Sequence, residues 1–224
     1  MRSKDKPIYQ VSIIRSGSTL VYQILCKLFP EKEIIKQHHF PKGIRYPIVS
    51  TYRDPRDILV SAWRTFILSK NRKLIKDRMA EEDVLLTLAF LKAPINDFNV
   101  GWGDNNILWL KYEDFYKDTN VVFEAIEKYF QIEISDGERR SISDEYTINK
   151  NKERAKAFKH FGEYDYLGTE IHGDHIFKGA VGGWKEVIPA DLHNIVNERL
   201  KNVLELWGYY SSDVLCGGIN SMAC

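Results

Sequence analysis

Apolar residues follow two different spacings along the 224-residue chain, which predicts strands and helices in alternation. Short apolar runs bounded by polar residues predict strands at 9–14, 46–52 and 106–112. Apolar residues three and four apart predict helices at 19–29, 55–68, 81–93, 120–130 and 189–210. This alternation is typical of an α/β domain with a central parallel sheet flanked by helices, in which ligands bind at the carboxyl ends of the strands. Residues 135–175 are polar and turn-rich.

Composition narrows the class of protein. The formal net charge of +1 argues against a nucleic-acid partner bound through bulk electrostatics, so any anion site must be local. No apolar run approaches the length of a membrane span, and no membrane partner is expected. Three cysteines without a CxxC pair indicate free thiols in a reducing compartment, which predicts a cytoplasmic protein. We expect a short disordered N-terminus at 1–7, one folded domain over 8–210 and a flexible tail at 211–224.

The loop between the first strand and the first helix carries groups that suit an anion. It holds Arg15, Ser16, Gly17, Ser18 and Thr19. Backbone N–H groups and the positive dipole end face outward where a helix begins, and the glycine allows close backbone approach. Taken alone, the loop fits an ordinary turn with a Ser/Thr cap about equally well. It is not a Walker A motif, because no lysine follows the glycine, which counts against an ATP-dependent kinase.

A second basic loop repeats this arrangement after the second predicted strand. Arg53 ends the strand, and Ser61 follows eight residues later in the next helix, so both could reach one anion. The neighbouring Arg56 and Asp57 could instead form a surface ion pair. A third segment, 177–185, has three glycines and a lysine within six residues, which is by itself typical of a flexible surface loop. Two anion loops on one sheet suggest a ligand with two separated phosphates.

In this order, the three segments resemble the sulfotransferases that use 3′-phosphoadenosine 5′-phosphosulfate (PAPS). In that family a KSGTT- or RSGST-type loop holds the 5′-phosphosulfate, an R-x7-S segment within "YRxPRDxxVS" holds the 3′-phosphate, and "RKGxxGDWK" closes over the nucleotide. The resemblance spans residues 8–210. It implies a P-loop-like sulfotransferase fold, PAPS as co-substrate, 3′-phosphoadenosine 5′-phosphate (PAP) as product, and no metal.

The resemblance also implies a set of nucleotide contacts. These are Arg15, Ser16, Gly17, Ser18, Thr19, Leu20, Arg53, Ser61, Tyr112, Lys178 and Gly179. Tyr112 belongs to "LKYEDF", which is similar to the family's "YED" strand end near adenine. Two positions depart from the pattern. Leu20 stands where a tryptophan is usual, so adenine stacking must come from elsewhere, and Phe177 replaces the arginine before Lys178-Gly179.

The segment "KQHHFP" at 36–41 resembles the family's "KTHLP", which carries the catalytic base. Alignment on Pro41 assigns the base to His39. The implied mechanism is in-line attack on sulfur, with His39 removing the acceptor's proton and Arg15 stabilising developing charge. The pair His38-His39 also invites a metal interpretation. Neighbouring residues of a strand face opposite sides, so one cation rarely binds both, and no metal is expected.

The acceptor cannot be identified from the residues. Aromatic side chains in 71–103 and 135–175 are expected to form its walls, and they suit a hydroxyl or amine of a small-molecule or carbohydrate acceptor. The family's dimer segment is poorly matched at 185–194, which leaves the oligomeric state open. Two other functions stay open: a non-catalytic nucleotide-binding relative and a P-loop-like small-molecule kinase.

Overall fold

The structure is a computed structural model, and it describes residues 6–41, 43, 45–68, 77–166, 168–173, 176 and 179–209. The expected tail at 211–224 and most of the expected N-terminal stretch lie outside these residues, as does Lys178.

Four parallel strands form the central sheet. They are β1 (Ile8–Val11), β2 (Ile34–Gln37), β3 (Ile48–Tyr52) and β4 (Ile107–Lys111), in the order β2-β1-β3-β4. The expected α/β fold with a parallel sheet is confirmed. The sequence prediction missed β2. This strand lies at the edge of the sheet with all four residues half-buried, so it lacks the apolar run of a central strand.

Helices flank the sheet and extend beyond it. They are α1 (Ser18–Leu28), α2 (Pro55–Ala62), α3 (Glu81–Asn99), α4 (Tyr112–Phe115), α5 (Asn120–Phe130), α6 (Asp136–Glu145), α7 (Ile148–Ala155), α8 (Trp184–Val187) and α9 (His193–Leu206). A π-helix, Trp63–Leu68, continues α2, and a 3₁₀ turn, Ala190–Leu192, precedes α9. The predicted helix at 55–68 is therefore two segments.

Helices α6 and α7 lie within 135–175, the segment that the sequence marks as polar and turn-rich. Both helices are polar, and each buries only one or two side chains, so they show no apolar periodicity. Their starts are fixed by capping instead: Ser135 and Glu138 form a capping box, and the hydroxyl of Thr147 accepts from the Lys150 amide.

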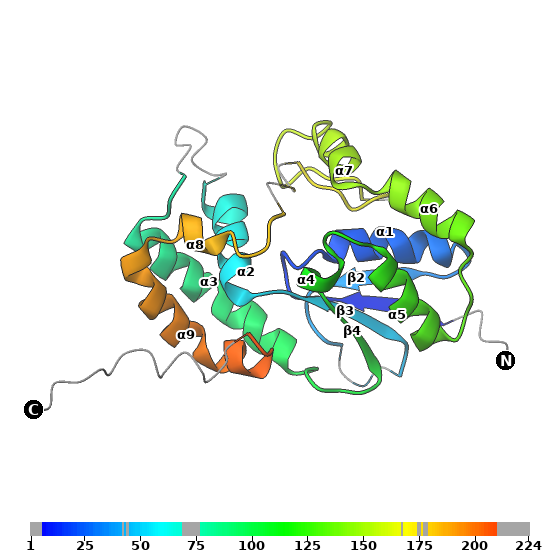
Figure 1. Cartoon of the computed structure of the whole chain (residues 1–224), viewed down its shortest axis with the longest axis horizontal. Helices are drawn as coiled ribbons and strands as arrows, with labels where there is room; N and C mark the ends of the chain where they lie inside the picture. Colours follow the sequence, from blue (N-terminus) through cyan, green and yellow to red (C-terminus); the bar gives the residue numbers. More distant parts are fainter. Residues whose placement is uncertain are drawn as a thin grey trace, which may run out of the picture.

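The helices form two groups on either side of the strand ends (Figure 1). Helices α1 and α5 pack against the sheet around buried Phe115 and Phe123, whereas α2, α3, α8 and α9 gather around Trp63 and Phe98. Because β1 leads into α1 and β3 leads into α2, the loops after these two strands lie between the groups. This is where the sequence placed its anion loops.

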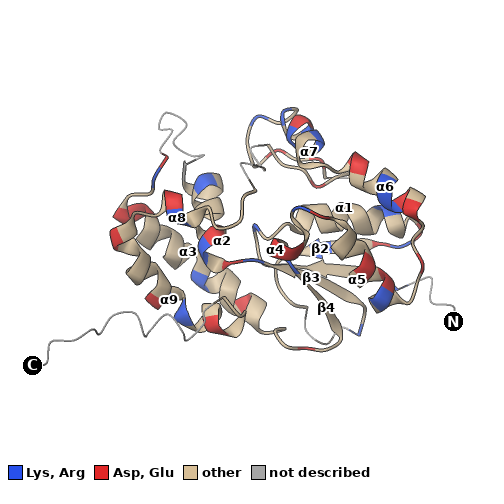
Figure 2. Ribbon diagram, in the orientation of Figure 1, with Lys and Arg blue, Asp and Glu red and all other residues tan. Residues whose placement is uncertain are grey.

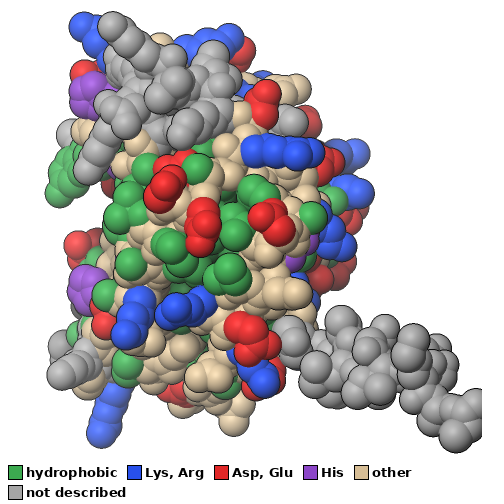
Figure 3. All heavy atoms as spheres, turned by 90° about the vertical axis from the view of Figure 1, so that its left-hand side faces the viewer, with side chains coloured by type: hydrophobic (Ala, Val, Ile, Leu, Met, Phe, Trp, Pro, Cys, Tyr) green, Lys and Arg blue, Asp and Glu red, His purple; other side chains and the backbone are tan. Residues whose placement is uncertain are grey.

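The described surface has no single dominant charge. Figure 2 shows cationic and anionic side chains interspersed along the helices, in keeping with the net charge of +1. Figure 3 shows apolar side chains gathered between acidic ones on one face, and α3 exposes Leu85, Leu86 and Phe90. Within the described ranges, no helix combines the length and apolar character needed to cross a membrane.

Candidate functional site

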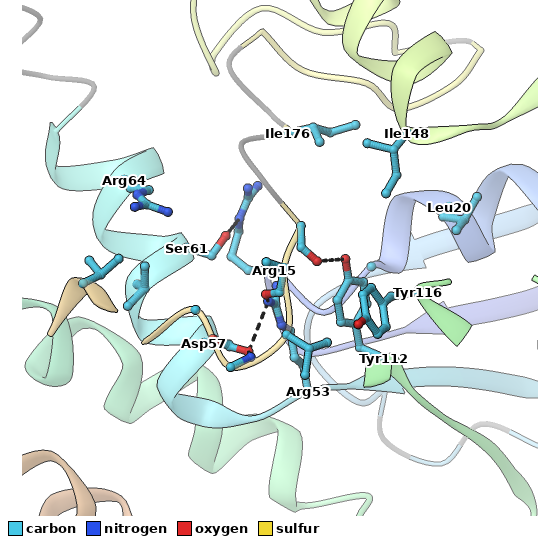
Figure 4. A pocket seen from close by; sticks show the side chains of 18 of the residues that line it. Arg15, Leu20, Arg53, Asp57, Ser61, Arg64, Tyr112, Tyr116, Ile148 and Ile176 are labelled. Carbon is cyan, nitrogen blue, oxygen red and sulfur yellow. Dashed lines mark hydrogen bonds and ion pairs between the residues drawn. The ribbon is translucent and has the colours of Figure 1, made fainter. Parts of the chain in front are cut away.

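Two cavities meet at the loop that joins β1 to α1. The first cavity has a volume of about 460 Å³ and lies toward α2 and the 179–183 segment. The second has a volume of about 440 Å³ and lies toward β2 and the 161–172 segment. Arg15, Gly17 and Thr19 line both cavities, so the loop forms their shared wall. Figure 4 shows side chains around the first cavity.

Gly17 lets this loop pass close to an aromatic ring. It has a φ of 86°, and a Cβ at this position would lie 2.7 Å from Cδ2 of Tyr112. Gly17 is also the N-cap residue of α1, and as a glycine it makes no side-chain capping hydrogen bond. The first turn of α1 therefore meets the cavities without a side-chain cap, which suits an anion.

Ser16 supports the loop from beneath. It is fully buried, and its hydroxyl lies 2.6 Å from both the carbonyl oxygen of Ile13 and the hydroxyl of Thr51. This hydroxyl is used within the fold, and the predicted contact of Ser16 with the nucleotide stays a prediction. Ser18 and Thr19 line the second cavity, and Leu20 lines the first.

Arg15 connects the two predicted anion loops. Its Nε donates to Oγ of Ser61 over 2.9 Å (Figure 4). Its guanidinium lies 5.8 Å from the ring centre of Phe161. Burial and the nearby charge of Arg53 lower the pKa of Arg15 to about 10. The side chain is therefore still a cation at neutral pH.

Arg53 is held on three sides at the end of β3. It pairs with Asp57 over 3.3 Å, lies 4.4 Å above the ring of Tyr112 and donates to the carbonyl of Ala180. Its Nε is buried and has no hydrogen-bond partner among the described residues. An unmatched buried donor on the wall of a cavity indicates a ligand that accepts a hydrogen bond.

Asp57 anchors the glycine-rich segment over the first cavity. Its carboxylate accepts from the Gly182 amide at 2.8 Å and from the Trp184 amide at 3.0 Å. The alternative of an Arg56–Asp57 surface pair is wrong, because Arg56 pairs with the helix cap Asp54 at 2.7 Å. The sequence analysis gave Asp57 no role at the site, although its place one turn after Arg53 was the available signal.

Tyr112 holds the other end of the same segment. Its hydroxyl donates to the carbonyl of Gly179 over 2.8 Å, and both residues line the first cavity. The remaining wall of this cavity is mainly apolar and aromatic. It includes Leu20, Tyr116 and Ile148, which Figure 4 labels, and also Tyr146. Sequence reasoning assigned Tyr146 to the acceptor wall and missed Tyr116 and Ile148.

Lys36 links β2 to the shared loop. Its Nζ donates to Oγ1 of Thr19 over 3.0 Å and lies 3.7 Å from a carboxylate oxygen of Glu170. Burial lowers the pKa of Lys36 to about 8, while Glu170 opposes that change. The sequence analysis quoted Lys36 within "KQHHFP" but gave it no role.

The two neighbouring histidines differ in position. His38 lines the second cavity, and its Nδ1 lies 2.8 Å from the carbonyl oxygen of Ser12. Surrounding protein, and the charges of Lys36 and Arg15, lower the pKa of His38. His39 is exposed, as His38 is, but it lines neither cavity, and its carbonyl accepts a hydrogen bond from the side-chain amide of Gln37. The geometry therefore favours His38 over the predicted His39 as the base.

A family model for the sulfotransferase domain matches residues 32–208. The chain belongs to the sulfotransferase family. A curated relative, mouse sulfotransferase 6B1, is 24% identical over an alignment of 212 residues. The match covers 86% of this chain and 64% of the relative, so the chain spans less than two thirds of that relative's length.

Solved structures extend this family likeness to the whole fold. The crystal structure of mouse sulfotransferase SULT7A1 complexed with PAP has a TM-score of 0.68, 15% identity, and coverage of 95% of this chain and 86% of its own. Retinol dehydratase in complex with androsterone and inactive cofactor PAP has a TM-score of 0.64, 17% identity, and coverage of 92% and 82%. The predicted family and fold of this sulfotransferase are thus confirmed, while the site residues stay predictions.

The aromatic residues expected to surround the acceptor in this sulfotransferase divide between site and core. Phe161 and Tyr164 line the second cavity. Phe98 and Trp102 pack instead within the hydrophobic core around α2, α3 and α9. In the part of the chain that the structure describes, no group of three acidic, histidine or cysteine side chains is arranged to hold a metal.

Proposed function

We propose that this sulfotransferase moves the sulfuryl group of PAPS to a hydroxyl of a small-molecule acceptor, releasing PAP. The observation that carries the proposal is that two cavities meet at one loop, 15–19, and that His38 lines the second of them. Group transfer between two substrates requires such an arrangement, because both must approach one point.

The first cavity suits the nucleotide. Arg53 and Ser61 would hold the 3′-phosphate, while Thr19 and the start of α1 would face the 5′-phosphosulfate. The space that Gly17 leaves open and the unmatched Nε of Arg53 fit an anion that accepts hydrogen bonds. The apolar and aromatic wall would contact adenine. Both solved relatives are described as complexes with PAP, which supports this assignment.

His38, in place of His39, would act as the general base. A carbonyl oxygen only accepts, so Nδ1 of His38 donates to Ser12, and the lone pair of the neutral ring lies on Nε2. Its lowered pKa keeps the ring neutral at pH 7. Nε2 would take the proton from the acceptor hydroxyl as its oxygen attacks sulfur.

Arg15 and Lys36 would stabilise negative charge where the cavities meet. PAPS supplies an activated sulfuryl group, and transfer requires charge stabilisation on its oxygens and on the leaving phosphate. Arg15 is charged throughout the neutral range, and Lys36 is mostly charged below its pKa of about 8. The hydroxyl of Thr19, bonded to Lys36, would be part of the same group of donors.

Nucleotide profiling followed by a transfer assay tests this function. PAP should raise the melting temperature more than AMP or ATP at equal concentration, since only PAP carries the 3′-phosphate that Arg53 and Ser61 would bind. Incubation with PAPS and a panel of phenols, alcohols and amines should then yield a sulfated product and PAP. Equal stabilisation by ATP and PAP, with no product from PAPS, would favour the kinase alternative.

A further inference from the structure

Tyr209, just beyond the end of α9, packs against the ends of two strands. Its ring lies edge-on to Tyr52, the last residue of β3, at 6.3 Å between centroids. The Nζ of Lys111, the last residue of β4, lies 4.5 Å from the centre of the same ring. The amide of Tyr209 donates to the carbonyl of Leu204 over 2.7 Å, which turns the chain back after the helix. The end of α9 is therefore fixed at the sheet edge where the second anion loop begins.

The hydroxyl of Tyr209 binds a carboxylate of α4. It donates to Oε2 of Glu113 over 2.5 Å. Burial and this carboxylate raise the pKa of Tyr209, so the phenol keeps its proton. The other oxygen of Glu113, Oε1, accepts from the backbone amide of Asp54 over 3.0 Å. One side chain thus joins the end of α9 to the turn between β3 and α2.

The amide that Glu113 holds belongs to the peptide group directly after Arg53. A peptide group is planar, so a hydrogen bond to its N–H also fixes the direction in which the backbone leaves Arg53. Tyr112, the residue before Glu113, contacts the same arginine from the side-chain end, with 4.4 Å between guanidinium and ring centre (Figure 4). Helix α4 therefore contacts Arg53 through its ring and, by way of Asp54, through its backbone.

The direction of the Arg53 side chain matters for a ligand. Its Nε is buried without a hydrogen-bond partner among the described residues, on the wall of the first cavity. A hydrogen bond weakens steeply as donor and acceptor lose alignment, so a small rotation of this guanidinium changes what it can bind. The proposed function gives Glu113 and Tyr209 no role, and neither residue lines either cavity.

We propose that Glu113 is a positioning residue for binding of the 3′-phosphate, that it acts through Arg53, and that Tyr209 holds Glu113 in the required orientation. This inference rests on the proposed function of the first cavity. It makes the end of α9 part of the nucleotide site, although the two segments are far apart in the sequence.

Charge alone predicts the opposite effect of a substitution. Glu113 is an anion near a proposed anion site, so loss of its charge should by itself strengthen PAP binding. Weaker binding in Glu113→Ala would therefore reflect position rather than charge. Asp114→Ala is the matched control, because it removes the same charge from the next residue, whose side chain is exposed. This variant should bind PAP as tightly as wild type or more tightly.

Titration calorimetry with PAP and AMP, in single and double variants, provides the test. Glu113→Ala should lower PAP affinity by about five- to tenfold and leave AMP affinity nearly unchanged, because AMP lacks the phosphate that Arg53 would bind. In an Arg53→Ala background, Glu113→Ala should change PAP affinity by less than about twofold, since its effect passes through the missing side chain. Glu113→Gln keeps a carbonyl oxygen for the Asp54 amide and should bind PAP nearly as wild type does.

Three results would overturn the role of Glu113 alone. These are equal losses for PAP and AMP, a loss that persists in full in the Arg53→Ala background, and a loss in Glu113→Gln as large as in Glu113→Ala. Should Glu113→Ala not fold, Tyr209→Phe keeps the ring and removes the hydroxyl. It should weaken PAP binding by about threefold and spare AMP, and unchanged PAP affinity would contradict the proposal.

The same titrations separate this inference from the proposed function. A wild type that binds PAP and AMP equally would overturn both the nucleotide assignment and the role of Glu113. A loss in Glu113→Ala that is selective for PAP, in a protein that forms no sulfated product from PAPS, would support the role of Glu113 while the transfer function fails.

Discussion

The two cavities are built in different ways from the same sheet edge. Around the first, Arg53 and Asp57 are 6% and 3% exposed, and their bonds connect β3, α2 and the 179–184 segment. Around the second, His38 is exposed and Glu170 and His172 are half-buried on a hairpin. The first cavity therefore depends on the closed core, whereas the second can change its wall without altering the fold. A fixed co-substrate and a variable acceptor fit this division.

The largest expected effect comes from the loop that the cavities share. Gly17→Val should abolish PAP binding, because the side chain would enter the ring of Tyr112 and the φ of 86° is unfavourable for valine. Gly103→Val is the matched control. Gly103 has a φ of 83° with nothing within 4 Å, so this variant meets the same backbone preference without the clash. Titration calorimetry with PAP measures both, and unchanged affinity in Gly17→Val would make the loop structural only.

A smaller loss should follow from Arg53→Ala. PAP affinity should fall by about 1.5–3 kcal/mol, the range for a charge-assisted hydrogen bond, while AMP binding changes little. Arg56→Ala is the matched control at the start of the same helix. Arg56 pairs with Asp54 and lines neither cavity, so its removal should leave PAP affinity unchanged. Equal losses for PAP and AMP in Arg53→Ala would place Arg53 away from the 3′-phosphate. Circular dichroism checks that both variants fold.

The pH dependence should reveal the groups of the second cavity. With an aliphatic alcohol as acceptor, kcat/KM should rise with pH through the pKa of His38, which lies below 6.5, because the base must be neutral. It should fall again near pH 8 as Lys36 loses its proton, by about tenfold at pH 9. Lys36→Arg should move the alkaline limb upward. A profile that stays flat to pH 9 in wild type would show that the charge of Lys36 is not needed.

The sequence predicted the fold and the first cavity because both depend on local patterns. A strand, a loop with Arg15 and Gly17, and a helix identify an anion site within fifteen residues, and the segment from Arg53 to Ser61 repeats the pattern. Contacts between distant segments were not predictable in this way. The hydrogen bonds of Asp57 to the 182–184 amides join residues more than a hundred positions apart.

The second cavity was harder to predict because an edge strand was missed. In an extended segment, Lys36 and His38 lie on one side and His39 on the other. With β2 recognised, this alternation would have favoured His38, whereas alignment on Pro41 favoured His39. Residues 161–166 and 168–173, and helix α7, show no apolar periodicity. They are defined instead by caps and turns, such as the hydrogen bond from the Thr169 amide to Asp165.

A single-turnover experiment with the two histidines tests the transfer mechanism most directly. Enzyme in excess over PAPS is mixed with a saturating acceptor, and PAP and sulfated product are followed over time. Wild type should form both in equal amounts, His38→Ala should be slower by about 10²–10⁴-fold with unchanged PAP affinity, and His39→Ala should keep most of the rate. A slow His39→Ala with an active His38→Ala would contradict the assignment of the base, and PAP release without a sulfated product would contradict transfer itself.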